Sequence, residues 1–185
     1  MTIEHATVQH YLGDLIAVIR HVSEAVSRHT KDDDLARIGH ASEVIGHTDR
    51  VLKRHLAALE THGNGRGGTG PAAAVKDVLT TTAGALAGLY GALRGEAASR
   101  MLRDDYAALS FVSICTTMLH TTALAVGDSA TAELTRQHLH DYPPLIMALS
   151  DLVPYAVVAD LATDRVAITD PGAAELADGD EADGG

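Results

Sequence analysis

Apolar residues recur at intervals of three and four along most of this 185-residue chain, and this spacing restricts its possible folds more than any other feature. Residues three and four apart lie on one face of an α-helix, so the pattern predicts amphipathic helices. The first covers residues 2–29, with an apolar face made of Val8, Leu12, Leu15, Ile19, Val22 and Val26. The second runs from about Asp34 to His62 and carries Ile38, Ala41, Ile45, Leu52, Leu56 and Leu59 along one side. The charged turn "TKDDD" between them predicts a helical hairpin.

The second half of the chain predicts another pair of helices. Residues 96–126 are apolar nearly all round between Ala107 and Leu124, so we expect this helix to be the most buried one. The tight turn "GDS" follows it, and either Asp128 or Ser129 is the expected N-cap of the next helix.

Two features interrupt the helical pattern. Pro143 and Pro144 lie in the middle of the last long helix, where proline removes a backbone hydrogen bond and clashes with the preceding turn. We therefore expect a kink or a break at that point. The glycine-rich residues 63–71 end the second helix, and residues 72–93 then predict a helix of modest propensity that serves as a crossover.

The resulting order is helix, turn, helix, long crossover, helix, turn, helix. Two hairpins joined by a long crossover that contains a short helix are the plan of an all-α, ferritin-like four-helix bundle. We expect residues 1–169 to form this single domain. Residues 170–185 are acidic and glycine-rich, and we expect them to be a disordered tail.

Charge and composition narrow the class of partner and the compartment. The chain has 14 basic and 25 acidic residues, a net charge of −11, and its basic residues are scattered, which argues against a nucleic-acid partner. Its only cysteine, Cys115, lies in an apolar run and predicts a buried reduced thiol. No signal-peptide pattern begins the chain, and no uninterrupted apolar run reaches transmembrane length. We expect a cytoplasmic protein without a membrane partner.

A polar stripe accompanies the apolar face of the second helix. His40, Glu43 and His47 fall within about 60° of one another on a helix that turns ~100° per residue. Imidazole and carboxylate groups that face each other across helices are ligands for iron, manganese or zinc. The same spacing also suits a surface ion pair between Glu43 and His47, and the spacing alone favours this simpler interpretation.

The first helix has a comparable stripe, which consists of His10, Asp14 and His21. If the turn lies near residues 31 and 32, antiparallel pairing places Asp14 level with Asp49. The same pairing places His21 near residue 42. On this hypothesis the two polar stripes meet across the first hairpin and form one site.

The segment "HASEVIGHTDRVLKRHLAALETHG" resembles the YciE/YciF group of ferritin-like bacterial and archaeal stress proteins. The segments "LRDDYAALS" and "LAVGDSATAELTRQHLHDYPPLIMALSDL" resemble the third and fourth helices of that group. The resemblance covers roughly residues 8–152. It implies a ferritin-like bundle, an association with stress, and a carboxylate-rich dinuclear metal site.

The resemblance also implies a set of metal ligands, although this chain keeps only part of it. The matching positions are Asp14, Glu43, His47, Asp104 and Asp141. Ala107 and Ile146 occupy positions where the group carries acids, and the two prolines disturb the backbone beside the last remaining acid. The resemblance therefore predicts a partial or degenerate dinuclear site, with no metal or partial iron or manganese.

Two functions follow from these expectations. The first is a stress-associated, homo-oligomeric helical scaffold or interaction module without catalysis. The alternative is an iron- or manganese-binding protein that handles oxidants at a carboxylate and histidine site. The sequence leaves open whether the chain is an enzyme.

Overall fold

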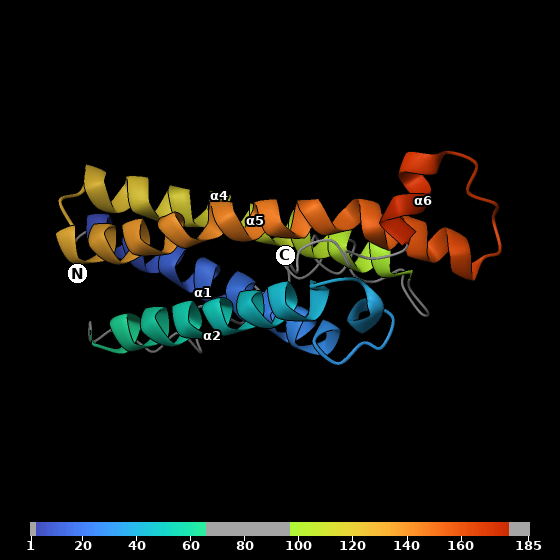
Figure 1. Cartoon of the computed structure of the whole chain (residues 1–185). Coiled ribbons are helices and arrows are strands. Elements are labelled where there is room, and N and C mark those ends of the chain that lie inside the picture. The colour runs from blue at the N-terminus through green and yellow to red at the C-terminus, as the bar shows by residue number, and fades with distance from the viewer. Residues whose placement is uncertain (1–2, 66–96, 178–185) are drawn as a thin grey trace, which may run out of the picture.

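The computed structural model describes residues 3–65 and 97–177, and every regular element in these two ranges is a helix (Figure 1). The elements are α1 (Ile3–His29), the 3-10 helix η1 (Leu35–Arg37), α2 (Ala41–Asn64), α4 (Ala98–Ala125), α5 (Ser129–Thr163) and α6 (Pro171–Ala177). The all-α class predicted from the spacing is confirmed for the described part of the chain. The predicted crossover helix, residues 72–93, lies outside the described residues.

The four long helices lie side by side, and each packs against two others (Figure 1). Helix α1 packs on α2 and α4, and α5 packs on α4 and α2. Arg20 forms an ion pair with Glu60 and Ser27 donates a hydrogen bond to Asp49, so α1 and α2 are antiparallel. Helices α4 and α5 are antiparallel across a short turn.

Two contacts fix the direction of α5 relative to α2. Arg54 Nη2 lies 2.7 Å from Asp141 Oδ2, and His62 Nε2 lies 2.9 Å from Thr131 Oγ1. These pairs run in opposite senses along the two helices, so α2 and α5 are antiparallel. Consequently α1 and α5 run one way and α2 and α4 run the other (Figure 1).

The core forms where the predicted apolar faces of these helices meet. Every apolar residue predicted for the face of α1 is at most 2% exposed. The largest side chains that are fully buried along the four helices include Leu12, Leu15, Ile19, Ile45, Leu52, Leu59, Leu102, Leu109, Leu119 and Tyr142. Each such side chain contributes about 1.5–3 kcal/mol relative to an exposed one, so this core supplies most of the driving force for folding.

Helix α2 begins later than predicted, at Ala41 and not at Asp34. The Asp32 carboxylate accepts hydrogen bonds from the backbone N–H groups of Asp34 and Leu35, and it thereby holds a separate 3-10 turn. Leu35 is buried, and Gly39 has a positive φ of 32°, which an α-helix does not allow. The connection is therefore longer than the predicted turn.

This longer connection changes the register of the first hairpin. Asp49 lies level with Ser27, and Gly63 packs against Leu12 and Ile16. Asp14 is therefore level with the end of α2 and not with Asp49. The prediction that the two polar stripes meet across the first hairpin is wrong, because it assumed a turn centred several residues too early.

Helix α5 is continuous from Ser129 to Thr163, so the predicted break at Pro143 and Pro144 does not occur. Both proline rings are exposed, and water can therefore solvate the carbonyl groups that lose their helical partners. Asp128, one of the two predicted candidates, is the N-cap, because its side chain accepts a hydrogen bond from the backbone N–H of Thr131.

Helix α4 is not the most buried helix, contrary to the sequence prediction. Among the described elements it packs mainly against α1 and α5, and Ile114 and Met118 on its outer side are 60% and 46% exposed. Cys115 is free and half-buried, and burial raises the pKa of its thiol to about 11. No uninterrupted apolar run in the chain reaches transmembrane length. Even so, α4 and α5 are each long and apolar enough on average to cross a membrane. Core helices of soluble proteins pass the same test.

The C-terminal segment differs from the prediction where the structure describes it. Residues 171–177, within the expected disordered tail, form helix α6, and this helix packs on α5. The remaining tail residues, 178–185, lie outside the described part of the chain.

Candidate functional site

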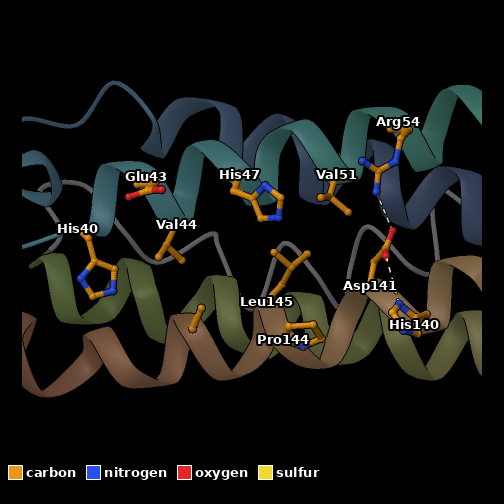
Figure 2. Close-up of a pocket in the computed structure, with 11 residues that line it drawn as sticks. His40, Glu43, Val44, His47, Val51, Arg54, His140, Asp141, Pro144 and Leu145 are labelled. Carbon is orange, nitrogen blue, oxygen red and sulfur yellow. Dashed lines mark hydrogen bonds and ion pairs between the residues drawn. The ribbon is translucent and has the colours of Figure 1, made fainter.

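A hollow of about 470 Å³ lies between α2 and α5 (Figure 2). Its lining residues are His40, Glu43, Val44, His47, Val51 and Arg54 from α2 and the residue before it, and His140, Asp141, Pro144, Leu145 and Ala148 from α5. The floor is apolar and the rim is polar. A pocket of this size and composition is typical of a binding site.

Glu43 and His47 stand one helical turn apart on the α2 side of the hollow, and both are exposed. Figure 2 shows His47 reaching toward α5, whereas the carboxylate of Glu43 points away from that imidazole. No ion pair joins these two side chains in the described structure, so the surface pair that the spacing favoured is not formed. Glu43 lies in the first turn of α2, where its negative charge is stabilised by the partial positive charge of the helix N-terminus.

Asp141 lies on the opposite wall and is held by two residues of α2. Its Oδ2 atom is 2.7 Å from Arg54 Nη2 and 2.9 Å from His55 Nε2. Burial alone raises the pKa of this carboxyl, but the hydrogen bonds from His55 and Arg54 outweigh burial and bring the pKa below its ordinary value. Asp141 is therefore ionised, and its Oδ2 atom already accepts hydrogen bonds from two side chains.

Behind Asp141 lies a buried polar network that the sequence patterns did not predict. His55 and His138 stack with ring centroids 3.8 Å apart, and His55 Nδ1 lies 3.1 Å from the hydroxyl oxygen of Tyr142. The three side chains are between 0% and 4% exposed. Such a network connects α2 to α5 at one defined register.

The protonation state of this network follows from its partners. Asp141 is ionised and can only accept, so His55 donates from Nε2 and accepts the Tyr142 hydroxyl hydrogen at Nδ1. Burial lowers the pKa of His138 to about 3, and the neighbouring His55 contributes to this shift. Burial likewise lowers the pKa of His55. Both stacked imidazoles are therefore neutral at neutral pH.

The other two predicted ligands lie elsewhere. Asp104 is buried on α4, and Arg103 binds its Oδ1 atom through Nε and Nη2, each at 2.7 Å. Asp14 lies on α1, where His10 Nε2 is 3.5 Å from its Oδ2 atom. Burial raises the pKa of the Asp14 carboxyl, and His10 offsets part of that rise.

The structure thus brings together Glu43, His47 and Asp141 around one hollow and leaves Asp14 and Asp104 outside it. Within residues 3–65 and 97–177, no three His, Cys, Asp or Glu side chains are close enough to hold a metal ion. The residues present therefore do not fit a dinuclear metal centre. Ala107 and Ile146, at positions where the resembled group carries acids, are both half-buried.

The missed residues are His55, His138 and Tyr142. The spacing of His138 and Tyr142, four residues apart, places them on one face of α5, and this is the signal that could have found them. His55 could not be paired with them, because its partner depends on the register between two helices that are distant in the sequence.

Comparisons of this chain with models of protein families, with curated proteins and with solved structures gave no match. The fold and the site define an all-helical protein with a polar-rimmed hollow between α2 and α5. The connection of this hollow to a function rests on its geometry.

Proposed function

We propose that this chain is a non-catalytic, ferritin-like helical scaffold of the YciE/YciF type that acts by binding through the hollow between α2 and α5. The directions of the four long helices support the ferritin-like part of the proposal, because two hairpins with parallel second and third helices are the order of that fold. The proposal includes the stress association and the cytoplasmic location that the sequence favours.

One observation is the reason why this proposal includes no metal chemistry. Asp141, the only predicted ligand on the α5 side of the hollow, shares its Oδ2 atom between Arg54 and His55. A metal that bound Oδ2 would have to displace Arg54 and the buried imidazole of His55, which would then lose its partner. A metal could still reach the Oδ1 atom, which lies 3.8 Å from His140 Nδ1, but a single carboxylate oxygen beside the Arg54 cation is a poor cation site. Asp104 is likewise engaged by Arg103. In this proposal Asp141 joins α5 to α2, whereas the Asp104–Arg103 pair lies within α4.

The hollow itself supports a binding role. Its apolar floor can take up an apolar side chain or a small apolar molecule, and its rim offers His40, His47 and Glu43 as exposed polar groups. The net charge of −11 argues against nucleic acid as the partner.

The competing candidate is an iron- or manganese-binding protein. The observation that favours it is that Glu43, His47 and Asp141 line one hollow. In the described structure the side chains of Glu43 and His47 make no hydrogen bond or ion pair. Binding on this hypothesis uses Asp141 Oδ1, because Oδ2 is shared between Arg54 and His55.

Metal analysis of the full chain, purified without chelator, separates the two candidates. The scaffold proposal expects well below one iron or manganese per chain, and a melting temperature that chelation shifts by less than about 2 °C. Stoichiometric metal that is lost in the Glu43→Ala/His47→Ala double variant would replace the scaffold proposal by the metal-binding one. A Ser150→Ala variant, outside the hollow, is the matched control.

A further inference from the structure

The outer face of α4 is an apolar stripe that no other part of the described structure covers. Its large exposed side chains are Tyr106, Phe111, Ile114, Met118 and Leu124, which are between 39% and 60% exposed. Phe111, Ile114 and Met118 are three and four residues apart, so they project from one side of the helix.

A shallow hollow adjoins this stripe. It measures about 310 Å³ and lies between α1 and α4, lined by Tyr11, Ile114, Thr117, Met118, Thr121 and Thr122. Ile114 and Met118 thus both project from α4 and border a depression beside it. A surface that carries projecting side chains next to a depression can be complementary to a copy of itself.

Charge distinguishes this face from the rest of the molecule. From Tyr106 to Gly127 the sequence contains no Asp, Glu, Lys or Arg, although the chain as a whole carries a net charge of −11. Two copies can therefore approach through this face with the least mutual repulsion. Between Tyr106 and Gly127 a basic protein partner would find no acidic side chain on α4 itself, and an anionic lipid surface would meet a strongly acidic protein.

The exposed apolar area fits a weak contact with a second copy. Half-exposed side chains of this size offer roughly 100 Å² each, so Phe111, Ile114 and Met118 supply on the order of 300 Å² per copy. A standard interface buries about 800 Å² per partner. The rest of the contact must come from the threonine and serine side chains beside the stripe, so we expect a weak homodimer.

We propose that α4 packs against α4 of a second copy of this chain, antiparallel and related by a two-fold axis between Ile114 and Met118. In this arrangement Ile114 of one copy faces Met118 of the other, and Phe111 faces the smaller Thr121. Large side chains thus meet small ones at the edges of the contact. This surface is separate from the hollow between α2 and α5, and neither proposal depends on the other.

Sedimentation of the full-length chain at roughly 100 µM, well above a micromolar dissociation constant, tests the proposal. The wild type is expected to be dimeric, and higher salt is expected to strengthen the dimer because it screens the repulsion between two acidic copies. Ile114→Asp is expected to weaken association by about 30-fold or more. Met147→Asp, at an exposed apolar residue of α5, is the matched control and is expected to remain dimeric. Helical circular dichroism verifies that both variants fold.

Cross-linking gives a second measurement that does not depend on an introduced charge. In a Cys115→Ser background, a mixture of the Ile114→Cys and Met118→Cys variants is expected to form a disulfide-linked dimer faster than either variant alone. A monomeric wild type, or a dimer that survives Ile114→Asp, would overturn the proposal. So would vesicle binding that Ile114→Asp abolishes, because it would assign the face to lipid. Protection of position 114 by residues 66–96 of the same chain in a monomer would also overturn it.

Discussion

The two helical hairpins of this protein differ mainly in how their helices are connected. Helices α1 and α2 are joined by eleven residues, Thr30 to His40, which include a 3-10 turn with buried Leu35. Helices α4 and α5 are joined by three residues, Val126 to Asp128. The second connection combines Gly127 at a φ of 75° with the side-chain cap of Asp128.

This difference teaches where the register of a hairpin is decided. In the second hairpin the glycine and the cap act within a few residues of the turn, and His120 contacts Ala132 and Thr135 across it. In the first hairpin the register depends on how deeply the connection itself is buried. A local turn can be predicted from local residues, whereas a buried connection depends on the helices that cover it.

The largest expected effect comes from the first connection. Leu35→Ala is expected to lower the free energy of unfolding by about 2–5 kcal/mol, because the leucine is 1% exposed and its removal leaves a cavity. Urea unfolding followed by circular dichroism measures this. Arg37→Ala, two residues away and exposed, is the control and should change stability by less than about 0.5 kcal/mol. A similar small loss for Leu35→Ala would show that the connection does not hold the first hairpin together.

The next prediction concerns how stability depends on pH. It tests the contact between the two hairpins at His138. Burial holds the pKa of His138 at about 3 in the folded protein, whereas an exposed imidazole titrates near 6.5. The unfolded chain therefore binds more protons than the folded one between these values. Stability is complete above pH ~6.5 and is expected to fall by roughly 2–3 kcal/mol by pH ~4.

Urea unfolding at a series of pH values checks this expectation. His138→Gln is expected to flatten the loss of stability between pH ~6 and ~4, because it removes the titrating group, whereas His140→Gln, at an exposed histidine on the same helix, should leave the slope unchanged. An unchanged slope in His138→Gln would place the acid sensitivity at a group other than His138.

The tight turn of the second hairpin is expected to give a smaller effect. Gly127→Ala should cost about 1–2 kcal/mol, because a residue with a Cβ atom is strained at a φ of 75° even though nothing lies within 4 Å of that position. Thermal unfolding is the measurement. A neutral result would mean that the turn can relax without strain.

The smallest expected effect separates the two N-caps. Asp128→Ala should cost about 1 kcal/mol, since its carboxylate accepts the backbone hydrogen bond from Thr131. His40→Ala, at the N-cap of α2, should cost less than about 0.5 kcal/mol because no side-chain cap bond exists there. Equal losses in the two variants would remove the distinction between a hairpin fixed locally and one fixed by burial.

The candidate site was only partly predictable from the sequence, because part of it depends on contacts between helices that are far apart in the sequence. Glu43 and His47 are recognisable from their spacing on one helix, and they do share the hollow with Asp141. The partners of Asp141 were not predictable, because Arg54 and His55 reach it across α2 and α5, which are 86 and 87 residues apart at this contact. No local pattern encodes that distance.

The sequence by itself determined the helical class and the apolar faces of α1 and α2, and it narrowed the cap of α5 to Asp128 or Ser129, since each depends on residues within one or two helical turns. Only the tertiary structure decided the register of the first hairpin, the exposure of α4 and the engagement of Asp141 by Arg54 and His55. It also decided that Pro143 and Pro144 leave α5 continuous, because packing along the helix outweighs the loss of two backbone hydrogen bonds at an exposed position. These outcomes depend on which surfaces meet, and that choice minimises the free energy of the whole chain.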